Sequence, residues 1–220
     1  MANTVFEGIR VLDFSNNVAG PCCASLLADM GAEVIKIERP VAGDDSRNIM
    51  PRVEDKSLTF IWTNRGKKSV ELDLHDPEAV ELIKRMIMDV DVIVESFKPG
   101  QMKKFGLDYE TVHAMKPDLV YCSISACGQT GAYASKPGFD IIAQGMSGLM
   151  DLAGDPDGAP VKQGVTIGDY VGSLNAYGAI VTALYYARAT GKGQLVDISL
   201  LDGLVYCNTT LDNAATNGAH

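Results

Sequence analysis

Two aspartates in the second half of the chain are the acids most able to do chemistry. Asp169 follows Gly168 and precedes a long apolar run, and Asp140 follows Gly138 and Phe139. An ionised carboxylate beside a flexible glycine can attack an electrophilic carbonyl and form a covalent intermediate. The same placement suits a helix N-cap, where the carboxylate accepts backbone N–H bonds and keeps its negative charge. For Asp169 both interpretations stay open, although spacing alone favours the cap, and Asp140 could likewise be a helix cap.

A second group of residues could bind a phosphate-bearing ligand. Arg39 directly follows a predicted strand, at the end of the sheet where open α/β folds bind ligands. Most lysines and arginines are simply solvated, so position is the only reason to single these out. The candidate cations are Arg39, Arg47, Arg65, Lys67, Lys68, Lys98, Lys103 and Lys104.

Several common catalytic patterns are absent from the sequence. No G-x-G-x-x-G run follows the first predicted strand, which argues against a dinucleotide, and no G-x-S-x-G run suggests a serine hydrolase. The three histidines, His75, His113 and His220, form no catalytic triad or metal-ligand spacing. The five cysteines are odd in number and match no metal or redox pattern, so we expect reduced thiols and no metal.

The elements that must position these residues alternate between strand and helix. Residues 9–14 predict a strand, 15–21 a loop, 22–30 a helix capped by Gly31, and 32–38 a second strand. This βαβ order predicts a parallel sheet with right-handed crossovers. Residues 16–19, Arg39 and residues 96–98 would then lie together at the carboxyl ends of the strands.

The same alternation continues along the rest of the chain. Asp76 and Pro77 predict the start of a helix whose apolar residues recur at helical spacing to Val90. Residues 170–186 are apolar enough for a buried helix but too short and too polar to span a bilayer. The other predicted strands cover residues 68–72, 91–95, 119–125 and 195–199, and the other predicted helices cover 109–115 and 139–147.

Composition limits the class of protein. The 220 residues are 46% hydrophobic and carry a net charge of −9, which allows a substantial core and argues against a nucleic-acid partner. With no signal peptide or membrane span recognised, we expect a cytoplasmic protein without a membrane partner. We expect residues 1–200 to form one large α/β domain and residues 201–220 to begin a linker towards a second domain.

Several motifs, taken in order, resemble the opening half of the family III CoA transferases. They include Gly8-Ile-Arg-Val-Leu-Asp-Phe14, Ala19-Gly-Pro21, the run from Leu27 to Pro40, Asn64-Arg-Gly-Lys-Lys68, Val94-Glu-Ser-Phe-Lys-Pro-Gly100, Pro137-Gly-Phe-Asp140, Gly168-Asp169 and Thr190-Gly-Lys-Gly193. This family includes formyl-CoA transferase and the carnitine CoA transferases, with the 2-methylacyl-CoA racemases as relatives. The resemblance covers nearly the whole chain.

The resemblance implies a fold, a coenzyme and a partner. We expect a Rossmann-like parallel sheet with flanking helices that binds coenzyme A, and a missing second domain. Acyl-CoA and a carboxylic acid would be the substrates, and two full-length subunits would interlock as a homodimer. No metal is implied.

The resemblance also assigns roles to residues. Asp169 matches the nucleophile and Asp140 an acid near it, while Val18 and Ala19 match the loop beside the thioester. Val18 replaces the glutamine of formyl-CoA transferase, which argues against formyl-CoA and oxalate as substrates. Lys104 replaces an arginine and so loses the planar fork. The positions matched to the coenzyme are Arg39, Leu72, His75, Ser96, Phe97, Lys98, Lys104, Lys136, Pro137, Gly138 and Phe139.

The implied reaction moves CoA through an aspartyl anhydride and an aspartyl-CoA thioester on Asp169. Two alternatives remain: a 2-methylacyl-CoA racemase, and a CoA-binding fragment without catalysis. A racemase needs two acid–base groups flanking the α-carbon. The related racemases supply a histidine where this chain has Phe139, which favours the transferase.

Overall fold

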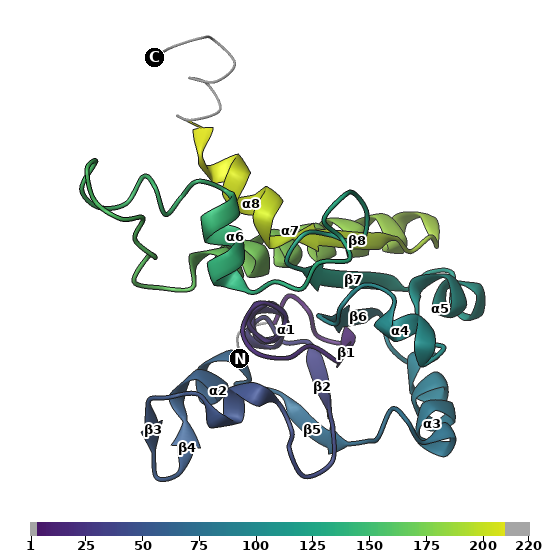
Figure 1. Cartoon of the computed structure of the whole chain (residues 1–220). Helices are drawn as coiled ribbons and strands as arrows, with labels where there is room; N and C mark the ends of the chain where they lie inside the picture. Colours follow the sequence, from purple (N-terminus) through teal and green to yellow (C-terminus); the bar gives the residue numbers. More distant parts are fainter. Residues whose placement is uncertain (1–3, 210–220) are drawn as a thin grey trace.

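Six parallel strands form a central sheet in the computed structural model, which describes residues 4–209 (Figure 1). The strands are β1 (Arg10–Asp13), β2 (Glu33–Glu38), β5 (Lys68–Glu71), β6 (Val92–Glu95), β7 (Val120–Ser125) and β8 (Leu195–Ser199). Their order across the sheet is β5-β2-β1-β6-β7-β8, and every neighbouring pair is parallel. The chain therefore builds outward from β1 in one direction and then in the other, which is the Rossmann-like order.

Alternating side chains of the central strands divide the core into two layers. Val11, Val92 and Val94 pack on one face of the sheet with α1 and α7. Leu12 and Ile93, one residue away on the same strands, pack on the other face. Because successive strand residues point to opposite faces, strands that are buried on both faces read as nearly continuous apolar runs.

Helices cover both faces of the sheet. On one face lie α1 (Ala19–Asp29) and α7 (Ile167–Thr190), and α7 runs along β7 and β8 in Figure 1. On the other face lie α3 (Pro77–Ile87), α4 (Gln101–Lys104) and α5 (Tyr109–Met115). Asp76 caps α3 as the sequence predicts, since its carboxylate accepts the Glu78 N–H at 2.9 Å.

Short elements between β2 and β5 escaped the sequence patterns. A 3₁₀ turn η1 (Asp45–Asn48), the hairpin β3 (Arg52–Val53) and β4 (Lys56–Ser57), and helix α2 (Leu58–Thr63) fill this stretch. None is long enough to show a periodic signal. They matter because η1 borders the site described below.

The two remaining helices lie near the carboxyl ends of the strands. Helix α6 (Asp140–Met146) and helix α8 (Leu200–Cys207) both pack on α7. Leu200 and Leu204 of α8 are part of the core. The expected boundary at residue 200 and the linker 201–220 stay predictions, and residues 210–220 lie outside the described part of the chain.

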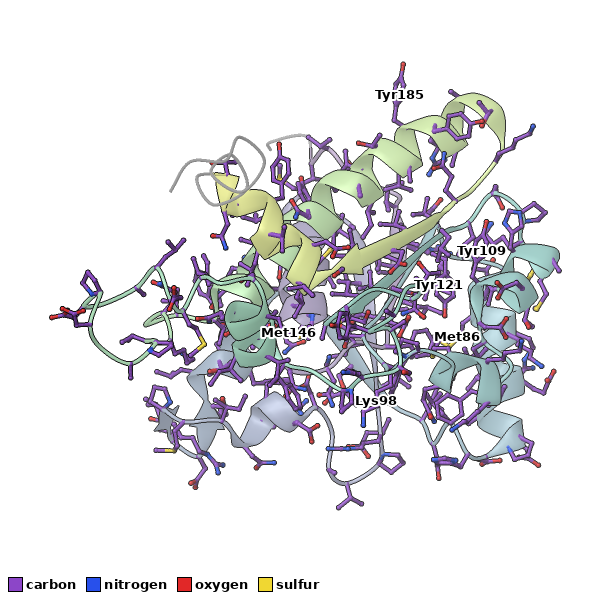
Figure 2. All side chains as sticks on the ribbon, turned by 45° about the horizontal axis from the view of Figure 1, so that its top comes forward. Met86, Lys98, Tyr109, Tyr121, Met146 and Tyr185 are labelled. Carbon is purple, nitrogen blue, oxygen red and sulfur yellow. The ribbon has the colours of Figure 1, made fainter. Side chains whose placement is uncertain are left out.

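Apart from the short elements that the sequence did not reveal, the element types match the expectations, and three details differ. Helix α1 begins at Ala19 rather than at residue 22, because Pro21 is accommodated inside the first turn. Asp169 is not an N-cap: Thr166 occupies that position and Asp169 is the third helical residue. Helix α7 is not buried all round, because Tyr185 projects from it into solvent (Figure 2) and Leu174 is 61% exposed.

Within residues 4–209, no helix has both the length and the apolar character needed to cross a bilayer.

Candidate active site

The strand order reverses between β1 and β6, and the loops that follow these two strands meet at their carboxyl ends. The Asn16 N–H donates to Ser96 Oγ at 2.9 Å, which joins the two loops directly. A Cβ atom on Gly20, at the start of α1, would collide with Ser15, so the loop needs glycine there. Open α/β sheets bind ligands at such a switch point.

A cavity of about 270 Å³ opens beside this point, over the ends of β1, β2, β5 and β6. Arg39, Leu72, His75 and Phe97, all predicted to contact the coenzyme, line it together. Arg39 and Phe97 thus lie at the same end of the sheet, as the sequence predicts. The rest of its wall is formed by Phe14, Ser15, Asn16, Lys36, Ile37, Glu38, Gly43, Asp44, Asp73, Leu74, Gln101 and Phe105.

Aromatic rings form one wall of this cavity. Phe105 meets His75 edge to face at 5.3 Å between ring centroids, and meets Phe97 in the same way at 6.1 Å. Phe105 directly follows α4, a single helical turn too short for the sequence to reveal, so its contribution was missed. Arg39, which pairs with Asp45, supplies a positive charge at the same cavity. An aromatic wall of this kind suits a ring-bearing ligand, and the Arg39 guanidinium offers hydrogen-bond donors beside it.

A second cavity has a volume of about 310 Å³. It contains Lys98, which the sequence analysis grouped with the residues of the first cavity. Lys98 lines this second cavity together with Lys103 and the carboxylate of Glu95. Glu95 is buried at the end of β6 and accepts the Phe97 N–H at 2.8 Å. Burial raises the pKa of Glu95 to about 7. This cavity holds no other residue matched to the coenzyme.

The remaining residues matched to the coenzyme line neither cavity. Ser96 contacts the loop at Asn16, as described above. Lys104, Lys136, Pro137 and Phe139 are exposed, and the Phe139 side chain, at the N-cap of α6, is 69% exposed. Lys136 instead lies over the ring of Tyr133, 4.7 Å from its centroid. Gly138 lies close to Ala126, where a Cβ atom would come within 2.6 Å.

Asp140 and Asp169 come together at the N-terminus of α7. Asp140 is the first residue of α6, but its carboxylate caps α7: Oδ1 accepts the Gly168 N–H at 2.7 Å and the Asp169 N–H at 3.4 Å. Gln144 donates to Asp140 Oδ2 at 2.6 Å. Asp140 therefore caps a helix, as expected, but that helix is α7 rather than α6, which Asp140 itself begins. The expectation that Asp169 is an N-cap is wrong, because Thr166 occupies that position.

Asp169 is left as a partly buried carboxylate with an unusual charge environment. Among the described residues, its carboxylate oxygens accept no hydrogen bond and pair with no cation. Burial raises the pKa of Asp169 to about 7, and the neighbouring charge of Asp140 acts in the same direction. The expectation that Asp169 keeps its charge as a hydrogen-bonded cap is therefore also wrong. A perturbed carboxylate of this kind is typical of a functional site.

Val18 and Ala19 connect this aspartate to the loop after β1. Both are buried, at the N-cap and first residue of α1. The Ser173 hydroxyl lies 2.7 Å from the Ala19 carbonyl oxygen and 2.7 Å from that of Asp169. The start of α1 and the first turn of α7 are thus in direct contact.

The residues that the structure describes offer no alternative metal-dependent site. Within 4–209, no group of three or more His, Cys, Asp and Glu side chains is arranged to hold a metal ion. The five cysteines are free thiols. The expectation that the reaction needs no metal stays a prediction.

Comparison with known proteins identifies the family. The family model described as CoA-transferase family III matches residues 6–219. The chain belongs to CoA-transferase family III. It is 44% identical over 203 residues to "Succinate--glutarate CoA-transferase" of Agrobacterium fabrum, a match that covers 89% of this chain and 51% of the relative. It is 42% identical over 199 residues to "Acetyl-CoA:oxalate CoA-transferase" of Acetobacter aceti, covering 90% of this chain and 51% of that protein.

A solved structure agrees with this family membership. A CAIB/BAIF family protein from Brucella suis superposes with a TM-score of 0.91 at 40% identity, covering 98% of this chain and 58% of that one. The family III chain described here spans about half the length of the curated relatives it matches.

Proposed function

We propose that the full-length protein transfers coenzyme A from an acyl-CoA donor to a carboxylic acid acceptor, with Asp169 as the nucleophile. The observation that carries the proposal is the Asp169 carboxylate itself. It stands at the first turn of α7 without a cation or hydrogen-bond donor among the described residues, and burial raises its pKa to about 7. A carboxylate that is poorly stabilised when ionised is a better nucleophile than a capped one.

The proposed reaction proceeds through two covalent intermediates on Asp169. Its carboxylate attacks the thioester carbonyl of the donor, and the tetrahedral intermediate expels CoA thiolate to leave a mixed anhydride. The thiolate then attacks the aspartyl carbonyl, releasing the donor acid and forming an aspartyl-CoA thioester. The acceptor carboxylate attacks this thioester to give a second anhydride and free thiolate. Attack of the thiolate on the acceptor's acyl carbon yields the new acyl-CoA and restores Asp169.

The cavity beside Arg39 is proposed to hold the nucleotide end of the coenzyme. Its edge-to-face rings and its cation suit an aromatic base that carries phosphates. The loop from Asn16 to Ala19 runs from this cavity to Ser173, which contacts Asp169. The acyl-pantetheine arm is proposed to follow this loop to the nucleophile.

Two further expectations belong with the proposal. We propose that the full-length protein is an interlocked homodimer in the cytoplasm, and its free thiols suit a reducing compartment. A chain that only binds CoA would form no covalent intermediate, which separates that alternative from the transferase.

Intact-mass analysis of the natural full-length protein tests the proposal. The donors are succinyl-CoA and acetyl-CoA, which appear in the names of two relatives. Incubation with either donor should give an adduct on Asp169 that hydroxylamine removes. Asp169→Asn should form none, while Asp118→Asn, an exposed aspartate that precedes the amino end of β7, should form it normally. CoA binding without an adduct in the wild-type protein would contradict the transferase.

A further inference from the structure

A network of buried charges lies between the Arg39 cavity and the loop after β1. Lys36 on β2 is 1% exposed, and Asp13 at the end of β1 is 0% exposed. The Lys36 ammonium lies 2.8 Å from Asp44 Oδ2 and 3.8 Å from Asp13 Oδ2. Lys67 Nζ lies 2.7 Å from the same Asp13 oxygen. Burying four charges is costly, and packing alone does not require it.

Every charge in the network has a partner of opposite sign within 4 Å. Burial by itself would raise the pKa of Asp13, but Lys36 and Lys67 outweigh burial and hold that pKa at about 2. Burial alone would lower the pKa of Lys36, yet Asp13 and Asp44 raise it. Asp13 and Lys36 are therefore charged near neutral pH. Burial lowers the pKa of Lys67, although Asp13 acts in the opposite direction. The short contacts between these groups hold the geometry of the network.

The network holds the backbone of the loop that follows β1. Lys36 Nζ donates to the Ser15 carbonyl oxygen at 2.7 Å, and Asp13 Oδ1 accepts the Ser15 N–H at 2.9 Å. Asp44 Oδ1 accepts the Asn17 N–H at 3.0 Å, where Asn17 has a positive φ of 68°. Asn17 thus adopts a left-handed backbone conformation, which asparagine tolerates better than most residues, and Asp44 holds its N–H.

The same loop leads to the nucleophile on the other face of the sheet. The Arg39 cavity has Lys36 and Asp44 in its wall, and its ring Phe105 packs with the α3 layer. Asp169 stands on α7, which packs with α1 on the opposite face. The loop crosses between them, and Ser173 joins its end at Ala19 to the Asp169 carbonyl oxygen.

We propose that Lys36 is a positioning residue for CoA transfer, because it fixes the Asp44 wall of the cavity and the Ser15 carbonyl in one geometry relative to Asp169. The inference rests on the proposed function. A bound acyl-CoA would contact the wall and the loop at once. A shift of about 1 Å in the loop would then misplace the thioester and cost on the order of 100-fold in the rate of transfer.

The test uses the natural full-length protein with the double variant Lys36→Met/Asp44→Asn. The single variant Lys36→Met would leave the buried Asp44 carboxylate without its cation, while Asp13 would keep Lys67, and such a variant can fail to fold. The double variant removes one charge of each sign, and the amide oxygen introduced by Asp44→Asn can still accept the Asn17 N–H. The matched control is Lys116→Met/Asp118→Asn, the same exchange in a solvent-accessible pair 3.2 Å apart at the other end of the sheet.

If Lys36 positions the loop, the double variant should have a kcat per adduct-forming site on the order of 10-fold to 100-fold below that of the wild-type protein. Its KM for acyl-CoA should change less than about threefold. Counting sites through the hydroxylamine-sensitive adduct removes the effect of unfolded protein. The surface control should keep the wild-type kcat. A double variant with wild-type kcat per site, whatever its melting temperature, would overturn the inference alone. A wild-type protein without CoA exchange would overturn the proposed function, and the inference with it.

Discussion

The ionisation of Asp169 gives the proposed chemistry a defined pH dependence. Burial and the charge of Asp140 raise the pKa of Asp169 to about 7, so the carboxylate is mostly protonated below that pH. Only the ionised form attacks a thioester. The rate of adduct formation should therefore rise with pH, reach half its maximum near pH 7, and fall about tenfold per pH unit well below it. Rapid-quench measurement between about pH 5 and 9 checks this, and a flat profile across that range would contradict it.

Asp140 contributes to this pKa through its charge, and that contribution can be separated from its capping role. Asp140→Asn keeps an oxygen that can accept the Gly168 N–H but removes the negative charge beside Asp169. The larger cause, burial, remains. The half-maximal pH of adduct formation should move below 7 without reaching the ordinary value of 3.8. Asp118→Asn, which changes an exposed aspartate far from the site, should leave the pH profile unchanged. If the half-maximal pH of Asp140→Asn stays the same or rises, the charge of Asp140 does not raise the pKa of Asp169.

At the scale of single elements, the sequence predicted the sheet well and the site only in part. Apolar runs of buried strands and the Asp76–Pro77 helix start are local signals, and the structure confirms them. The capping of α7 by Asp140 is a contact across 28 residues in the chain. Spacing could assign a cap to Asp140 but could not say which helix it serves. Phe105 was missed for a similar reason, because its cavity depends on how α4 packs.

Replacing either of two α7 glycines by alanine should change the free energy of unfolding in opposite directions. Gly172 faces α8, and a Cβ atom there would overlap the buried Leu200 side chain. Gly178 is exposed, and a Cβ atom there would meet nothing within 4 Å. Gly178→Ala should raise the free energy of unfolding by about 0.5–1 kcal/mol through helix propensity. Gly172→Ala should lower it by about 1–3 kcal/mol through overpacking, as measured by urea unfolding. Equal effects at the two positions would mean that α8 does not pack on α7 as described.

At the scale of the whole molecule, the fold assembles the site from segments far apart in sequence. The reversal of strand order between β1 and β6 brings Asn16 against Ser96, which are 80 residues apart. The return of α7 over the same end of the sheet brings Ser173 to Ala19, which are 154 residues apart. No spacing rule links such pairs. The family resemblance singled out Asp169 as the proposed nucleophile, which stays a prediction. Its raised pKa, and the lack of a hydrogen bond to its carboxylate within residues 4–209, could be found only from the structure.

The arrangement of the whole site also favours the proposed transferase over a racemase. A racemase must remove a proton from one face of the α-carbon and return one to the other, which calls for two groups able to carry protons. The exposed side chain at position 139 is phenylalanine, which cannot carry one. The two histidines of the described chain lie on the face opposite α7, since His75 packs edge to face on Phe105 and His113 stacks on Tyr109 of α5.

We therefore expect CoA exchange without epimerisation. The natural full-length protein, incubated in deuterated water with a 2-methylacyl-CoA and a free acid, should transfer CoA while the α-carbon stays unlabelled. Asp140 stands near Asp169 and would have to serve as the second base of a racemase, so Asp140→Asn provides the control. Mass spectrometry of the recovered thioester measures both outcomes at once. Rapid α-deuteration that Asp140→Asn abolishes, with no acyl exchange, would show that the two aspartates perform proton transfer instead.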